Sequence, residues 1–121
     1  MKRYLTLGIK AFLTLAFLAA GGAKLAGAEM MVQTFDAVGL GQWFRYVTGA
    51  IEVAGAILLW VPSAIGLAAG LLTATMVGAV LAHTFILGPS AVPAVFLGVL
   101  SGYIAWTNRK DIPMIGTGLS A

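Results

Sequence analysis

Four long apolar runs divide the chain, at about residues 4–26, 44–61, 64–87 and 91–107. A bilayer core of ~30 Å needs ~20 apolar residues in a helix, so each run has about the length of one membrane crossing. Turn-forming residues separate the later runs at Pro62-Ser63 and at Gly88-Pro89-Ser90. Because these connections are short, neighbouring helices are expected to be antiparallel, and the pattern predicts an all-α, integral membrane four-helix bundle.

A more polar segment, AEMMVQTFDAVGLGQW at residues 28–43, separates the first two runs. It has apolar residues at helical spacing on one side, namely Met31, Val32, Phe35 and Val38, and polar residues on the other, namely Glu29, Gln33 and Asp36. This pattern predicts a short amphipathic helix lying flat on the outer face and ending at Gly39 or Gly41. Two interpretations are open, a plain tether between the first two spans or a lid over the outer mouth of the bundle.

The composition agrees with a single transmembrane domain over residues 1–121. Hydrophobic residues make up 60% of the chain and charged residues 9%, and the mean hydropathy is +1.00. Soluble domains have roughly a quarter charged residues, so this chain has too few to cover a water-facing surface. The net charge of +3 is small, and no nucleic-acid partner is expected.

The basic residues predict the orientation in the membrane. Lys2 and Arg3 precede the first run, and Arg109 and Lys110 follow the last. With an even number of spans, the positive-inside rule places both termini in the cytoplasm. A cleaved secretory signal is the alternative for the N-terminal segment. Lys10, which interrupts the apolar stretch, and Lys24, just before the supposed cleavage point, argue against it.

The sequence excludes several kinds of chemistry. It has no cysteine and one histidine, so disulfides, thiolate metal sites, cysteine nucleophiles and multi-histidine metal or haem sites are not expected within one chain. We expect no metal site, and the sequence identifies no catalytic residue and does not decide whether the protein is an enzyme.

Glu52, in the run GAIEVAGAILLW, is the most unusual residue. It lies eight residues into the second span, which is a depth of roughly 12 Å at ~1.5 Å per residue. A charge at that depth costs at least ~3 kcal/mol on insertion scales. Neighbours on the same helical face are small or polar, including Thr48, Gly49 and Gly55. We therefore expect Glu52 to point into the bundle.

Four ionisable residues from three spans are expected to converge on the outer half of the bundle: Lys24, Arg45, Glu52 and His83. Arg45 or Lys24 is the expected ionic partner of Glu52, because an isolated buried carboxylate would be very unfavourable. Two interpretations are open. The cluster is either a structural ion-pair network that fixes helix packing or a proton-linked or anion-binding cavity that opens outward.

Three segments carry a resemblance to a known family: AAGGAKLAG at the end of the first run, RYVTGAIEVAGAILLW in the second and VLAHTF in the third. Together they resemble the DoxX-like membrane proteins over nearly the whole chain. The resemblance implies a four-helix, multi-pass protein of the bacterial inner membrane. Some relatives resemble the small subunits of a thiosulfate–quinone oxidoreductase, and distant ones look like assembly helpers. By position, the polar pattern of the family falls on Lys24, Arg45, Glu52 and His83.

The expected function is a non-catalytic or accessory subunit of a quinone-linked membrane redox complex, with a buried polar site around Glu52. The alternatives are a small transporter or lipid-handling protein that uses the same cavity, and a purely structural assembly partner. No cofactor is expected in the chain itself, although a quinone or lipid is expected between helices. The expected partners are the lipid bilayer, further copies of the chain and proteins of the redox complex.

Overall fold

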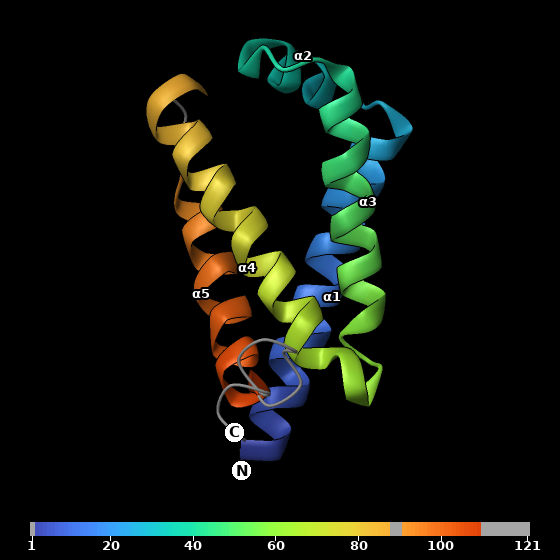
Figure 1. The fold of residues 1–121 in the computed structure, drawn as a ribbon, viewed down its shortest axis with the longest axis vertical. Helices are drawn as coiled ribbons and strands as arrows, with labels where there is room; N and C mark the ends of the chain where they lie inside the picture. The colour runs from blue at the N-terminus through green and yellow to red at the C-terminus, as the bar shows by residue number, and fades with distance from the viewer. Residues whose placement is uncertain (1, 88–90, 110–121) are drawn as a thin grey trace, which may run out of the picture.

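The computed structural model describes residues 2–87 and 91–109, and these contain helices and no strand. The four long helices are α1 (Lys2–Ala26), α3 (Gln42–Leu58), α4 (Ile65–Ala82) and α5 (Val92–Thr107), and α2 (Glu29–Val38) crosses one end of them (Figure 1). The helical class predicted from the sequence is confirmed, and the long helices coincide with the predicted runs to within a few residues. The predicted turn at 88–90 and the tail from 110 onward lie outside the described residues.

The long helices associate as two pairs. Helix α1 packs along α3 and helix α4 packs along α5, while smaller contacts join α3 to α4 and α1 to α5. The pairs approach each other at the end where α1 begins and diverge toward the end where α2 lies (Figure 1). Helix α2 contacts both α3 and the segment His83–Leu87 that follows α4, so it bridges the two pairs.

The interior of the bundle is mostly apolar and draws on all four long helices, with Arg45, Glu52 and Ser101 as its buried polar or charged residues. Among its fully buried side chains are Leu13, Phe17, Leu59, Leu72 and Ile104. The outward faces are also apolar: Leu15 of α1 is 72% exposed and Val99 of α5 is 65% exposed. Apolar side chains therefore occur both inside the bundle and on its outer faces.

The third apolar run differs from the single helix that the sequence predicts. The predicted turn before it forms a short 3-10 helix, η1 (Pro62–Ala64), and the run itself continues as α4 and ends as a π-helix, η2 (His83–Leu87). Proline at the first position of η1 fits the rule that the first N–H of a helix has no intrahelical partner. The π-helix has no comparable signal in the sequence.

Helix α2 ends where the sequence predicts. Gly39 adopts φ 84° and its N–H donates to the carbonyl of Phe35. This left-handed conformation is easily accessible to glycine and ends many helices. Phe35 is the buried residue of α2, and its ring meets the ring of Phe44 edge to face at 5.9 Å. The apolar face of α2 therefore packs on the start of α3.

Two helical segments are long and apolar enough to cross a membrane, judged by length and composition: Arg3–Ala26 and Pro62–Ile86. Helix α5 is apolar but has 16 residues. Helix α3 has 17 residues and includes Arg45 and Glu52. The prediction of four crossings is thus supported in two segments, and for the other two it stays a prediction.

Candidate functional site

The most distinctive polar feature is an ion pair between α1 and α3. Lys24 lies in the last turn of α1 and Glu52 lies in the middle of α3. Their atoms Nζ and Oε1 are 2.7 Å apart, and the side chains are 13% and 2% exposed. A buried charge is strongly unfavourable when it is alone, so each partner makes the burial of the other possible.

Two glycines bring the backbones close enough for this pair to form. A Cβ atom added to Gly21 would lie 2.8 Å from the carbonyl oxygen of Gly49. One added to Gly49 would lie 2.9 Å from Cβ of Lys24. Small residues at such a crossing permit backbone contact that any larger residue would prevent. The Gly21–Gly49 crossing therefore sets the distance between Lys24 and Glu52.

Arg45, one turn into α3, joins the same end of α1 through the backbone. It is 5% exposed. Its Nε donates to Oε1 of Gln42 at 2.7 Å, and Nη1 donates to the carbonyl oxygen of Lys24. The guanidinium also lies 4.3 Å from the ring centre of Tyr46. A cation at a helix C-terminus interacts favourably with the carbonyls left unpaired there, so Arg45 caps α1.

Gln42 extends this network to α2. Its Nε2 donates to the carbonyl of Val32 at 3.0 Å and to Oδ1 of Asp36 at 3.1 Å. Its Oε1 accepts the Arg45 hydrogen bond. One amide side chain therefore connects α2, the start of α3 and, through Arg45, the end of α1. Sequence reasoning did not single out Gln42, because a glutamine at a helix start has no spacing or charge that marks it.

The fourth predicted site residue, His83, lies on the segment that follows α4 rather than on α1 or α3. His83 is the first residue of the π-helix η2, which ends the third run. This π-helix contacts α2. Within residues 2–87 and 91–109, its Nδ1 is buried without a hydrogen-bond partner. The structure thus joins Lys24 to Glu52, places Arg45 on the backbone of Lys24, and leaves His83 without a direct bond to the other three.

A second polar contact joins α1 to the end of α3 at the opposite end of the bundle. Nε1 of Trp60 donates to Oγ1 of Thr14 at 2.7 Å. The ammonium of Lys10 lies 4.6 Å from the centre of the Trp60 ring. The contact between Trp60 and Thr14 joins residues 46 positions apart, so no local sequence pattern indicates it.

The residues of this network determine which chemistry is available. In the described part of the chain, no group of three histidine, cysteine, aspartate or glutamate side chains could hold a metal ion. Lys24 and Glu52 form an ion pair with each other. Nε and Nη1 of Arg45 donate hydrogen bonds to Gln42 and to the Lys24 carbonyl. The arrangement fixes α1, α2 and α3 relative to one another.

The fold and this network define a small helical protein with apolar outer faces and a buried lysine–glutamate pair. The chain belongs to the DoxX-like family, whose model matches residues 9–105. This match confirms the resemblance seen in the sequence and includes all four predicted site residues. No curated protein and no solved structure was found to match the chain.

Proposed function

We propose that the protein is a multi-pass membrane protein whose four long helices all cross the bilayer. The observation that supports this most directly is the distribution of polarity. Glu52 is 2% exposed inside the bundle, while each long helix exposes a large aliphatic side chain outward: Leu15, Ile57, Val77 and Val99. An apolar outside around a charged inside suits hydrocarbon as the surrounding solvent. Helices α3 and α5 run beside the two longer helices, which supports crossings for all four.

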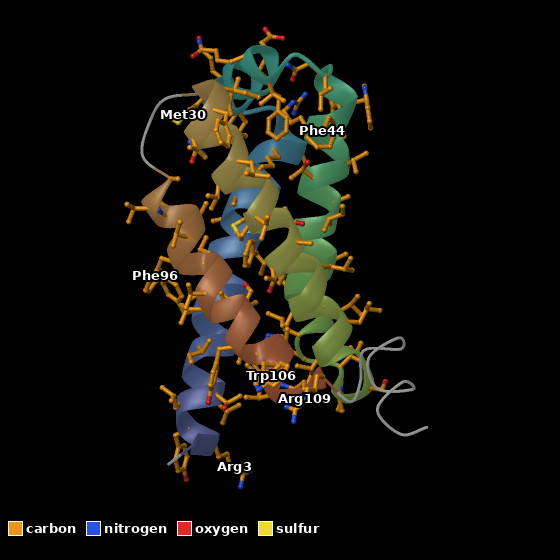
Figure 2. All side chains as sticks on the ribbon, turned by 60° about the vertical axis from the view of Figure 1, so that its left-hand side comes forward. Arg3, Met30, Phe44, Phe96, Trp106 and Arg109 are labelled. Atoms are coloured by element: carbon orange, nitrogen blue, oxygen red, sulfur yellow. The ribbon has the colours of Figure 1, made fainter. Side chains whose placement is uncertain are left out.

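In the proposed orientation, the ends of the chain face the cytoplasm. Arg3 and Arg109 lie at one end of the bundle, and Met30 and Phe44 lie at the other (Figure 2). Positively charged residues concentrate on the cytoplasmic side of membrane proteins. Helix α2 then lies on the outer face, where its amphipathic surface suits the interface.

Cysteine labelling in intact cells tests this orientation, because the natural chain has no cysteine. Thr107→Cys, at the end of α5, should resist a membrane-impermeant thiol reagent, and Gln33→Cys, on α2, should react. Both variants should react after the cells are opened. The reverse pattern in intact cells would refute the orientation.

Within the membrane, we propose that the protein acts as a non-catalytic, accessory subunit of a quinone-linked redox complex. The closed Lys24–Glu52 pair supports the non-catalytic part, because each charge is compensated by the other inside the α1–α3 interface. The redox part rests on the resemblance of some DoxX-like proteins to quinone-linked subunits. In this proposal, the rigid α1–α2–α3 unit presents a fixed surface to a partner subunit.

Purification from native membranes in a mild detergent tests the role. A stable complex with a redox protein that contains bound quinone, and that loses redox activity without this chain, is the expected result. A chain that purifies alone and gives proton-coupled uptake in liposomes, abolished by Glu52→Gln, would instead establish the transporter alternative. A stable complex without quinone or redox activity would establish the purely structural alternative.

A further inference from the structure

An apolar groove runs along the outside of the bundle between α1 and α5. Its volume is about 410 Å³, and its lining consists of Tyr4, Leu5, Gly8, Ile9, Phe12, Phe96 and Leu100. The rings of Phe12 and Phe96 meet edge to face at 5.8 Å at one end of this lining. The groove is shallow and open along its length, which suits a ligand that lies along the surface of the bundle.

Gly8 gives the groove its depth. A Cβ atom at this position would have no heavy atom within 4 Å. The missing side chain is therefore not required for helix packing, and it leaves room on the surface. From Tyr4 to Phe12 the helix rises ~12 Å, at ~1.5 Å per residue. That length is close to the ~15 Å that one leaflet contributes to a ~30 Å hydrocarbon core.

The end of the bundle at which the groove begins, near Tyr4, carries two arginines. Arg3 precedes Tyr4 and is exposed, and Arg109 follows the end of α5 (Figure 2). Arg109 donates one hydrogen bond to the Trp106 carbonyl at 2.9 Å. Since a guanidinium has five N–H donors, others remain for a ligand. The carboxylates of residues 2–87 and 91–109 all lie on α2 and α3, away from this groove.

We propose that this groove binds one anionic phospholipid from the cytoplasmic leaflet. An acyl chain lies along Gly8 between α1 and α5, and the phosphate headgroup lies at Arg3 and Arg109. Arginine suits this role because its planar donors match phosphate oxygens in pairs. The inference depends on the membrane orientation proposed above and is independent of the redox role, so cysteine labelling and lipid binding test separate claims.

Native mass spectrometry of the full chain in detergent tests the proposal, with phosphatidylglycerol and phosphatidylcholine of identical acyl chains as probes. A basic residue near an anionic surface contributes ~1 kcal/mol, which is about fivefold in affinity. We therefore expect tighter binding of phosphatidylglycerol, and about a fivefold loss of this preference in Arg3→Gln. Lys10→Gln is the matched control, because Lys10 lies over Trp60 on the α3 side, and the preference should be unchanged there.

A second pair of variants tests the acyl-chain part. Gly8→Leu fills the groove and should abolish retention of the lipid, whereas Gly22→Leu, also on α1 and also without a heavy atom within 4 Å of its Cβ position, should retain it. Melting temperatures close to wild type would show that both variants fold. Equal binding of the two lipids, or equal loss in both glycine variants, would refute the proposal. A quinone that displaces the lipid, and whose own binding is lost in Gly8→Leu, would assign the groove to quinone. That result would also refute the proposal.

Discussion

Helices α1 and α3 are joined by polar groups at both ends of their interface, whereas α4 and α5 pack through apolar and small side chains. In the first pair, the Lys24–Glu52 ion pair lies toward α2, and the Trp60–Thr14 hydrogen bond lies toward the opposite end. These contacts require particular atoms at particular distances, so they fix the rotation and the register of α1 on α3.

The second pair is joined differently. None of the ion pairs of the described residues joins α4 to α5. The methyl group of Thr73 faces α5, 3.9 Å from the position of a Cβ added to Gly102, and its hydroxyl donates to the Ala69 carbonyl of its own helix at 2.7 Å. Close approach occurs at Gly98, where an added Cβ would lie 3.2 Å from Cβ of Met76. Among the described residues, the packing of apolar and small side chains thus accounts for this interface, and we expect it to tolerate the loss of any single polar group.

The largest expected effect comes from breaking the ion pair. Glu52→Gln leaves the Lys24 ammonium buried without a counter-charge, and removal of one partner of a buried pair costs ~3–5 kcal/mol. We expect a large fall in the midpoint of thermal unfolding in detergent. Glu29→Gln is the matched control on the exposed part of α2, and a surface change of this kind stays within about 0.5 kcal/mol.

The double variant Lys24→Met/Glu52→Leu separates charge from shape at the same position. Since well-packed apolar residues often replace a buried ion pair without loss, most of the stability should return. If the double variant is as unstable as Glu52→Gln, the unpaired charge of Lys24 is not the cause of the lost stability. The difference between the two helix pairs would then not be electrostatic.

The next effect concerns the glycine crossing. In Gly21→Ala, the new methyl group meets the Gly49 carbonyl at 2.8 Å, and overpacking of this kind costs ~1–3 kcal/mol. Its neighbour supplies the control, because a Cβ at Gly22 meets no heavy atom within 4 Å. Gly22→Ala should be neutral or stabilising, since alanine favours helix more than glycine does. Equal unfolding midpoints for the two variants would refute the close crossing.

A smaller effect is expected at the other end of the α1–α3 interface. Thr14→Val keeps the shape of the side chain but removes the acceptor for Trp60. The loss of one such hydrogen bond costs ~1 kcal/mol, and the fluorescence of Trp60 should change because its N–H loses its partner. A spectrum identical to wild type, measured with Trp43 and Trp106 replaced by phenylalanine, would contradict the contact.

The smallest effect is predicted in the apolar pair. Ser101 of α5 is fully buried, and within the described residues its Oγ has no hydrogen-bond partner. Ser101→Ala removes a hydroxyl that contributes no bond. The variant should be neutral, or more stable by up to ~1 kcal/mol, because an unpaired buried hydroxyl is itself unfavourable. A marked loss of stability in chemical denaturation would reveal a polar contact between α4 and α5.

The helices were predictable because each depends on a local pattern. Long apolar runs predict the four bundle helices, and the spacing around Phe35 predicts α2 and its end at Gly39. The π-helix at His83 was not predictable, because no residue type or spacing in this segment distinguishes it from an α-helix.

The candidate site was predictable only in outline. The sequence identifies Glu52 as a buried charge and names two cations as partners. It could not choose between them, because the choice depends on the Gly21–Gly49 crossing, which places Lys24 rather than Arg45 beside Glu52. The network through Gln42 depends on three chain segments meeting, and no single segment shows it.

The contact between Phe12 and Phe96 also has a consequence for the order of folding. These rings come from opposite ends of the described chain, whereas the α3–α4 and α4–α5 contacts join neighbours in sequence. Contacts between distant residues require the closure of a long loop and form late. We therefore expect the α1–α5 contact to form last during folding and to open first during local unfolding. The backbone amides of α5 on the side that faces α1 should then exchange hydrogen rapidly.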